Sequence, residues 1–372
     1  MRIAYVINSL EGGGAAFPVP SIVAALARHG AEVSVLALAR RDGRAEAAIR
    51  AGGTEVTVRA GGTADHWSAY RWLKAELAKR RPDAVWTSLT RATLLGQAAA
   101  RPLGVPVVSW QHAAFLKPAN LRLMRLARRR SALWVADSAA VADFCRGAIG
   151  IAPDRIVEWP IFRADPEAPH AAPWSPGEPV RLGSLGRLHP VKGYDVLVEA
   201  LARVSSTTPW TLAIGGEGDA RARLEAAIGA AGLKERVTLA GFIDDPLDFL
   251  AGLHLYLQPS RSEGCAVAAH QAMQAGLPLV ASAVGEMAHS VVPGVTGALV
   301  APGDPVALAA AIETALVAPG RLHAMGAAGR TRLLERFSAD LFEARAGEIV
   351  RRLGELCRAR RSVGRRASGR SA

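Results

Sequence analysis

The sequence predicts an α/β protein of two domains, each built on a parallel sheet with helices between its strands. Three observations support this prediction. Short apolar runs of strand length alternate with longer stretches of helical composition along most of the chain, which is typical of parallel sheets. The 372 residues are enough for about two domains. A proline-rich stretch near the middle separates two such series.

The first half offers seven strand candidates: Arg2–Ile7, Glu32–Leu38, Thr54–Val58, Asp83–Ser88, Pro106–Trp110, Ala132–Ala136 and Arg155–Trp159. Helical stretches such as Trp67–Arg80 and Ala139–Ile149 lie between them. The stretch 160–179 then holds six prolines and few apolar runs, a composition that indicates a linker.

A new series of strands begins after this stretch. It offers six candidates: Val180–Leu188, Trp210–Ile214, Val237–Ala240, Leu253–Leu257, Leu277–Ala281 and Gly297–Val300. The run 337–356 reads as one amphipathic helix. We therefore expect these parts in order: a first domain over residues 1–165, a linker over 166–179, a second domain over 180–337, a C-terminal helix over 338–356 and a basic, disordered tail over 357–372.

The composition of the chain indicates the cellular compartment in which we expect the protein. The three cysteines, Cys145, Cys265 and Cys357, are far apart and lack metal-ligand spacing, which fits a reducing environment. The N-terminus enters a strand without the features of a signal peptide. The longest stretch without Asp, Glu, Lys or Arg, residues 264–285, contains polar side chains and an internal Gly-Leu-Pro, which argues against a membrane span. We expect a cytoplasmic protein, either soluble or peripheral on the inner face of the cell membrane.

The net charge of +12 is unevenly distributed. Residues 351–372 hold eight arginines and one glutamate, and a second basic cluster lies among leucines at Arg122, Arg125, Arg128, Arg129 and Arg130. Both clusters are candidates for binding anionic lipid head groups. For the tail, a solvated, disordered end is the alternative. Nucleic acid is not an expected partner, because no nucleic-acid motif accompanies the charge.

The stretch 260–282 is the most informative part of the chain. It reads as a loop with Glu263, a helix that ends at Gly276, and a buried strand. In open parallel sheets, ligands bind where strands end and helices begin. The backbone N–H groups of a helix N-terminus suit a phosphate, and a carboxylate suits sugar hydroxyls. Both features at one place indicate a nucleotide-sugar.

This stretch resembles the donor-site motif of the GT-B-fold retaining glycosyltransferases of family four ("glycosyl transferases group 1"). Glu263 falls on the first of the two glutamates of that motif, whereas Gln271 stands in place of the second. Cys265 and Ala266 replace the usual Phe-Gly. The positions that match are Ala272-Met273, Gly276-Leu277-Pro278 and Ala281-Ser282. The resemblance implies that residue 271 meets the ribose, where a glutamine accepts hydrogen bonds without charge assistance.

A second motif, GRLHPVKG, contains Arg187 and Lys192 in a loop between a strand and a helix. The resemblance implies that both bind the donor diphosphate. Fixed cations stabilise the charge that grows on this leaving group as the glycosidic bond breaks. They could replace a metal, since Asp244 and Asp245 are adjacent and not spaced as a metal-binding acidic pair. We expect no metal and no cofactor, with a nucleoside diphosphate sugar as co-substrate.

Further site candidates follow from the same resemblance. His112, after the fifth strand candidate, is implied to lie close to the transferred sugar. Gly13 and Gly14 form a glycine-rich loop after the first strand, in the place of the family's loop near the donor phosphate and acceptor. The other expected donor contacts are Gly216, Glu217, Gly218, Ser262, Gly264, Cys265, Ala266 and Val267.

Motifs cover most of the second half, and the first half resembles the family only in architecture. The resemblance implies two Rossmann-like domains facing each other across a cleft, with the C-terminal helix crossing back to the first domain. It implies a retaining hexosyltransferase that acts on a glycan or lipid-linked acceptor, in bacterial cell-surface polysaccharide or lipopolysaccharide synthesis. Two alternatives stay open. One is a nucleotide-sugar epimerase on the same fold, and the other is a catalytically inactive, transferase-like binding subunit.

Overall fold

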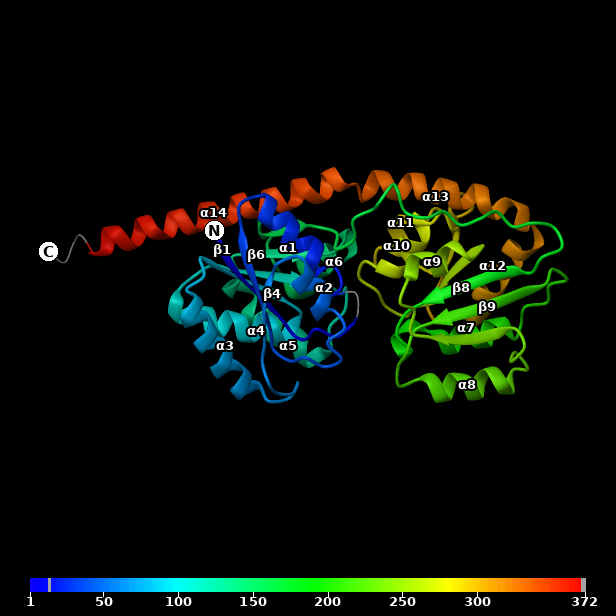
Figure 1. Ribbon diagram of the computed structural model, residues 1–372, viewed down its shortest axis with the longest axis horizontal. Helices are drawn as coiled ribbons and strands as arrows, with labels where there is room; N and C mark the ends of the chain where they lie inside the picture. Colours follow the sequence, from blue (N-terminus) through cyan, green and yellow to red (C-terminus); the bar gives the residue numbers. More distant parts are fainter. Residues whose placement is uncertain (13–14, 369–372) are drawn as a thin grey trace. The chain divides into compact units, whose positions relative to one another are not determined.

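The computed structural model describes residues 1–12 and 15–368, with side chains as far as residue 360. The chain forms two compact units (Figure 1). Residues 1–161 and the C-terminal segment from Asp340 make the first, and Phe162–Ala339 makes the second. The expected boundary at residue 165 is therefore wrong by a few positions.

The first unit holds a sheet in the order β3-β2-β1-β4-β5-β6-β7, with parallel pairing throughout. The strands are β1 (Arg2–Ile7), β2 (Glu32–Ala37), β3 (Glu55–Val58), β4 (Ala84–Ser88), β5 (Val107–Gln111), β6 (Leu133–Ala136) and β7 (Ile156–Glu158). The helices are α1 (Val19–Arg28), α2 (Glu46–Ala51), α3 (His66–Arg80), α4 (Thr90–Ala100), α5 (Pro118–Ala127), α6 (Ala139–Phe144) and α14 (Ala339–Ser368).

The second unit holds a parallel sheet in the order β10-β9-β8-β11-β12-β13. The strands are β8 (Val180–Leu185), β9 (Trp210–Gly215), β10 (Val237–Gly241), β11 (Leu255–Gln258), β12 (Leu279–Ser282) and β13 (Gly297–Val300). The helices are α7 (Tyr194–Leu201), α8 (Arg221–Ala230), α9 (Pro246–Ala251), α10 (Val267–Gln274), α11 (Met287–Ser290), α12 (Pro305–Val317) and α13 (Leu322–Arg336). Every strand expected from the sequence is present, with ends that differ by a few residues.

Most strand residues of both sheets are buried, as expected of parallel sheets that helices cover on two faces. In the first unit, the rings of Trp86, Trp110 and Trp159 are fully buried and lie 5.1–6.0 Å apart. Phe342 of α14 adds its ring 5.0 Å from Trp159. Helix α14 thus completes the core of the first unit, to which the whole C-terminal segment belongs.

Two expectations about flexible segments need correction. The stretch 166–179 is not a free linker, because it packs on the second unit: Ala168 and Ala171 are buried, and the Ala171 amide donates to the Ala275 carbonyl at 2.7 Å. The tail from residue 357 is not disordered as far as it is described, because α14 continues to Ser368.

No single helix in the described part of the chain is long and apolar enough to cross a membrane. One bent pair, Pro305–Val317 with Pro319–Arg360, meets the criterion by length and composition only.

Candidate active site

Glu263 is the centre of a hydrogen-bonded cluster just past the carboxyl end of β11. Its Oε1 accepts from Lys192 Nζ at 2.7 Å, from Ser260 Oγ at 2.6 Å and from Gln258 Nε2 at 2.8 Å. Ser260 and Gln258 are buried, and the Lys192 side chain is 24% exposed. Three donors on one oxygen hold the carboxylate in a single orientation. The described residues offer no hydrogen bond to Oε2, which is left for a ligand.

Lys192 comes from a loop that lies 71 residues earlier in the chain. It ends the short 3₁₀ turn Pro190–Lys192, which follows β8, and β8 is the neighbour of β11 in the sheet. Gly193 has φ +68°, and a Cβ there would overlap the Pro259 carbonyl. The Arg261 amide donates to the Val191 carbonyl at 2.8 Å. Glycine thus lets the two loops approach closely enough for the Lys192–Glu263 ion pair.

The glycine loop after β9 packs against the same β8 loop. Gly216 and Gly218 lie so close to it that a Cβ would overlap the carbonyls of Gly186 and Leu188, respectively. The Leu188 amide donates to the Glu217 carbonyl at 2.9 Å, while the Glu217 carboxylate pairs with Arg221. The expected donor loops after β8 and β9 therefore form one backbone surface. Arg187 lies on it with an exposed side chain.

The start of α10 carries the remaining donor candidates. Ser262 lies half-buried in the loop and Gly264 is buried. Ala266 is the N-cap and has left-handed backbone angles, φ +53° and ψ +60°, which are costly for alanine. No side chain caps this helix end, and the Ala269 and His270 amides donate to the Ala266 carbonyl. Within the described residues, the N–H groups of Val267 and Ala268 are therefore the ones available to an anion. Cys265, which precedes Ala266, is buried.

His270 is hydrogen-bonded to the backbone of Ala266, and the sequence did not predict this contact. Its Nδ1 lies 3.1 Å from the Ala266 carbonyl and its Nε2 lies 2.9 Å from Ser290 Oγ. Burial lowers the pKa of His270 to about 4, so the ring is neutral near pH 7. Gln271, one residue on, is half-buried, and its side chain makes no hydrogen bond within the described residues. It is therefore available to a ligand.

His112 lies in the first unit, immediately after β5. Its Nδ1 is 3.0 Å from Asp137 Oδ2, and its Nε2 is 2.6 Å from Ser88 Oγ. The imidazole stacks on Trp110 with ring centres 5.4 Å apart, and the Trp110 indole N–H donates to Asp137 Oδ1. The sequence did not predict that Ser88 and Asp137, or Gln258 and Ser260, belong to the site. Gly13 and Gly14 lie outside the described residues.

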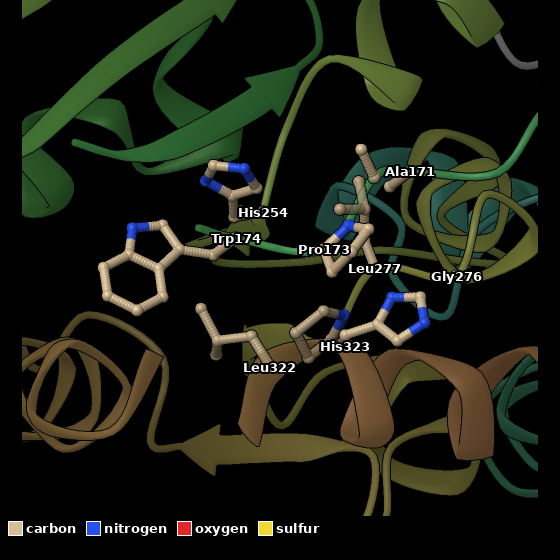
Figure 2. Close-up of a pocket in the computed structure, with 10 residues that line it drawn as sticks. Ala171, Pro173, Trp174, His254, Gly276, Leu277, Leu322 and His323 are labelled. Carbon is tan, nitrogen blue, oxygen red and sulfur yellow. The ribbon is translucent and has the colours of Figure 1, made fainter. Parts of the chain in front are cut away.

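A small pocket in the second unit is separate from this cluster. Figure 2 shows its lining, which includes Trp174, His254, Leu322 and His323. His254 precedes β11 and Gly276–Pro278 precede β12, so the pocket lies at the amino ends of these strands. Glu263 lies at the opposite, carboxyl edge. Among the described residues, no group of three or more His, Cys, Asp or Glu side chains could hold a metal ion.

Comparison with known proteins places both units in a family. Residues 12–162 match the family described as "Glycosyltransferase Family 4", and residues 168–332 match "Glycosyl transferases group 1". The 2-deoxystreptamine glucosyltransferase of Streptomyces kanamyceticus is 30% identical over 66% of this chain and 70% of its own. The lipopolysaccharide core mannosyltransferase LpcC of Rhizobium leguminosarum bv. viciae is 35% identical over 40% and 44%, respectively.

Solved structures agree on the fold. The HepE protein of Anabaena in complex with UDP-glucose superimposes with a TM-score of 0.81, at 22% identity, over 94% of this chain and 99% of its own. The lipopolysaccharide outer core galactosyltransferase WaaB gives 0.71 at 18% identity, over 93% and 98%. The chain belongs to the group 1, family 4 glycosyltransferases, and its two Rossmann-like units have the GT-B fold.

Proposed function

We propose that this glycosyltransferase moves a hexose from a nucleoside diphosphate sugar to a glycan or lipid-linked acceptor, with retention of configuration. The observation that carries the proposal is the Glu263 cluster. A carboxylate held through Oε1, with Oε2 available, is suited to accept hydrogen bonds from sugar hydroxyls. It lies beside a helix N-terminus and a backbone surface suited to a diphosphate.

The Lys192–Glu263 ion pair gives Lys192 two roles in this proposal. A diphosphate beside Glu263 would be repelled by the carboxylate unless a cation lay between them. Lys192, 2.7 Å from Glu263 Oε1, is that cation. With Arg187 it stabilises the charge that develops on the leaving diphosphate, without a metal. Gln271 accepts from the ribose, and His112 contacts the transferred sugar.

Retention is proposed to follow from attack on the face that the leaving group occupies. The bond between the anomeric carbon and the diphosphate oxygen breaks, and a bond from the acceptor oxygen to the same carbon forms. The acceptor proton goes to the departing diphosphate oxygen. The structural neighbour HepE, solved in complex with UDP-glucose, supports the donor class. Two relatives named for lipopolysaccharide core synthesis support the acceptor class.

A lipid-linked acceptor requires access to a membrane surface, and α5 offers a docking face. Phe115, Leu123 and Leu126 are large apolar side chains that are exposed, Leu126 by 80%. Exposed arginines such as Arg122 and Arg129 lie among them, and residues 84–136 contain no Asp or Glu. This combination is typical of a helix that binds an anionic membrane interface. We propose that α5, with the C-terminal arginines, holds the enzyme on the inner face of the membrane.

Vesicle sedimentation tests the docking face. Leu126→Ser should weaken binding to anionic vesicles, and Val317→Ser, an equally exposed position in the second unit, should not. Deleting residues 364–372, with three arginines, should cost about 1 kcal/mol per arginine at low salt. Unchanged binding in both the Leu126 variant and the truncation would remove the membrane from the proposal.

The activity is tested by incubating the protein with a panel of NDP-sugars, with and without lipid-linked acceptors, and measuring NDP release in the presence of EDTA. Acceptor-dependent release of NDP, with the anomeric configuration of the donor sugar retained in the NMR spectrum of the product, is the expected result. Conversion of the sugar without NDP release would indicate an epimerase. Binding without any turnover would indicate a binding subunit, and inactivation by EDTA would contradict the metal-free mechanism.

A further inference from the structure

Ser88, His112 and Asp137 form a single hydrogen-bonded row at the carboxyl edge of the first sheet. Ser88 ends β4, His112 directly follows β5, and Asp137 directly follows β6. These three strands are neighbours in the order β4-β5-β6. The row has the order of a nucleophilic triad, but Ser88 is fully buried, and so its hydroxyl cannot reach a carbonyl substrate. The hydrogen-bonded row of Ser88, His112 and Asp137 must therefore have another role.

The partners of Asp137 fix the position of the proton on His112. As a carboxylate, Asp137 only accepts hydrogen bonds. Oδ1 accepts from the Trp110 indole N–H, and Oδ2, 3.0 Å away, accepts from His112 Nδ1. In the neutral ring the proton is therefore on Nδ1, and Nε2 is an acceptor. In the structure Ser88 donates to this Nε2 at 2.6 Å.

We propose that Asp137 is a positioning residue that keeps His112 a hydrogen-bond acceptor, so that Nε2 receives a hydroxyl of the ligand in place of Ser88. That the ligand is the transferred sugar rests on the proposed function. Ser88 then competes with the ligand for the same atom. The buried hydroxyl of Tyr5, which interacts with Ser88 and has no other hydrogen-bond partner in the described structure, is an alternative acceptor for the Ser88 hydroxyl.

Two substitutions in the row are expected to change the affinity for the ligand in opposite directions. In Asp137→Asn, the amide has one oxygen for two donors. The indole of Trp110 cannot give up its N–H, whereas an imidazole can change tautomer, so the oxygen should turn to Trp110. The amide NH₂ then donates to Nδ1, and the His112 proton moves to Nε2. In Ser88→Ala, the proton stays on Nδ1 and the competing donor is lost.

The test combines two readouts on the full chain. Long-range ¹H–¹⁵N spectra of histidine-labelled protein report the tautomer, with His112 assigned by its absence in His112→Gln. Calorimetry reports the affinity for UDP-glucose and for UDP. We expect Asp137→Asn to move the proton to Nε2 and weaken UDP-glucose binding about fivefold, and Ser88→Ala to keep the proton and strengthen it by a similar factor, as for one hydrogen bond. UDP affinity should not change.

Ser109→Ala is the matched control, because Ser109 is buried on β5 and bonds to Thr87 and Ser131, but not to His112. It should leave both readouts unchanged. A proton that stays on Nδ1 in Asp137→Asn would overturn the proposal, as would affinities for UDP-glucose that shift in the same direction in both variants. If Asp137→Asn does not fold, Ser88→Ala decides alone, and weaker or unchanged binding overturns it. If wild type binds neither ligand, the proposed donor fails, and the tautomer spectra still decide this inference.

Discussion

Glu263→Ala is predicted to destabilise the second unit as well as to stop catalysis. Removing the carboxylate leaves the Ser260 hydroxyl and one Gln258 N–H buried without an acceptor. A buried donor without a partner costs about 1–3 kcal/mol, so the loss of two should be about 2–6 kcal/mol. Lys192 is partly exposed and can be hydrated, and so it adds little. Glu263→Gln keeps an oxygen for both buried donors and should lose only about 1 kcal/mol, since charge assistance is gone.

Hydrogen exchange measured by mass spectrometry can locate this effect. Peptides within 255–275 should lose protection in Glu263→Ala far more than in Glu263→Gln, while peptides of β1 and β2 serve as an internal reference. Glu217→Ala is the control variant, because its ion pair with Arg221 is exposed and should contribute at most about 1 kcal/mol. If Glu263→Ala and Glu263→Gln both stayed within about 0.5 kcal/mol of wild type, the cluster would have no structural role.

Four further predictions concern the same unit. Lys192→Ala and Arg187→Ala should each lower turnover about 10²-fold, and near-normal rates in both folded variants would contradict their role as diphosphate-binding cations. Gln271→Ala should weaken NDP binding by about 1 kcal/mol in calorimetry, whereas Gln271→Glu should keep or improve it. Ala266→Gly should stabilise the protein by about 0.5–1 kcal/mol in thermal unfolding, because it relieves the left-handed backbone angle at φ +53°. The pKa of His270 is about 4 in the folded protein against 6.5 for a free histidine, so the unfolded chain binds more protons between these values. Stability should be complete above pH 6.5 and fall by on the order of 3 kcal/mol towards pH 4, and His270→Gln should flatten that part of the curve.

The sequence predicted the sheets better than the segments that join the units. β6 and, after Arg2, β1 are continuous apolar runs, and such a run is sufficient to predict a buried parallel strand. The prolines of 166–179 indicated a linker, because proline breaks regular structure. What the composition could not show is that this segment packs on α10 and α13. The Ala171 amide donates to the carbonyl of Ala275, which caps α10, at 2.7 Å, and Arg330 of α13 donates to the Pro166 carbonyl.

The sequence also failed to predict that α14 continues past residue 356. Its many arginines suggested a solvated tail, since a run of like charge usually repels itself. In the structure, Arg351 pairs with Glu355 one turn later, and Cys357 Sγ contacts the Asp83 carbonyl at 3.4 Å. One acidic residue at helical spacing and one thiol–carbonyl hydrogen bond are local details. As sequence signals, these two details are weaker than the high positive charge of the segment, and so the helix could not be predicted from them.

The candidate site shows why some of its residues could be predicted from the sequence and others could not. Glu263 could be identified because its motif is contiguous along the chain, and Arg187 and Lys192 because theirs is too. The partners of His112 lie on separate strands, 24 and 25 residues away, and nothing local marks them. Each, however, is the last residue of a strand or the first after it. Given the strand order β4-β5-β6, parallel pairing brings the three chain positions to one edge. Strand order is therefore the one piece of information that would turn the polar residues at strand ends into predicted neighbours.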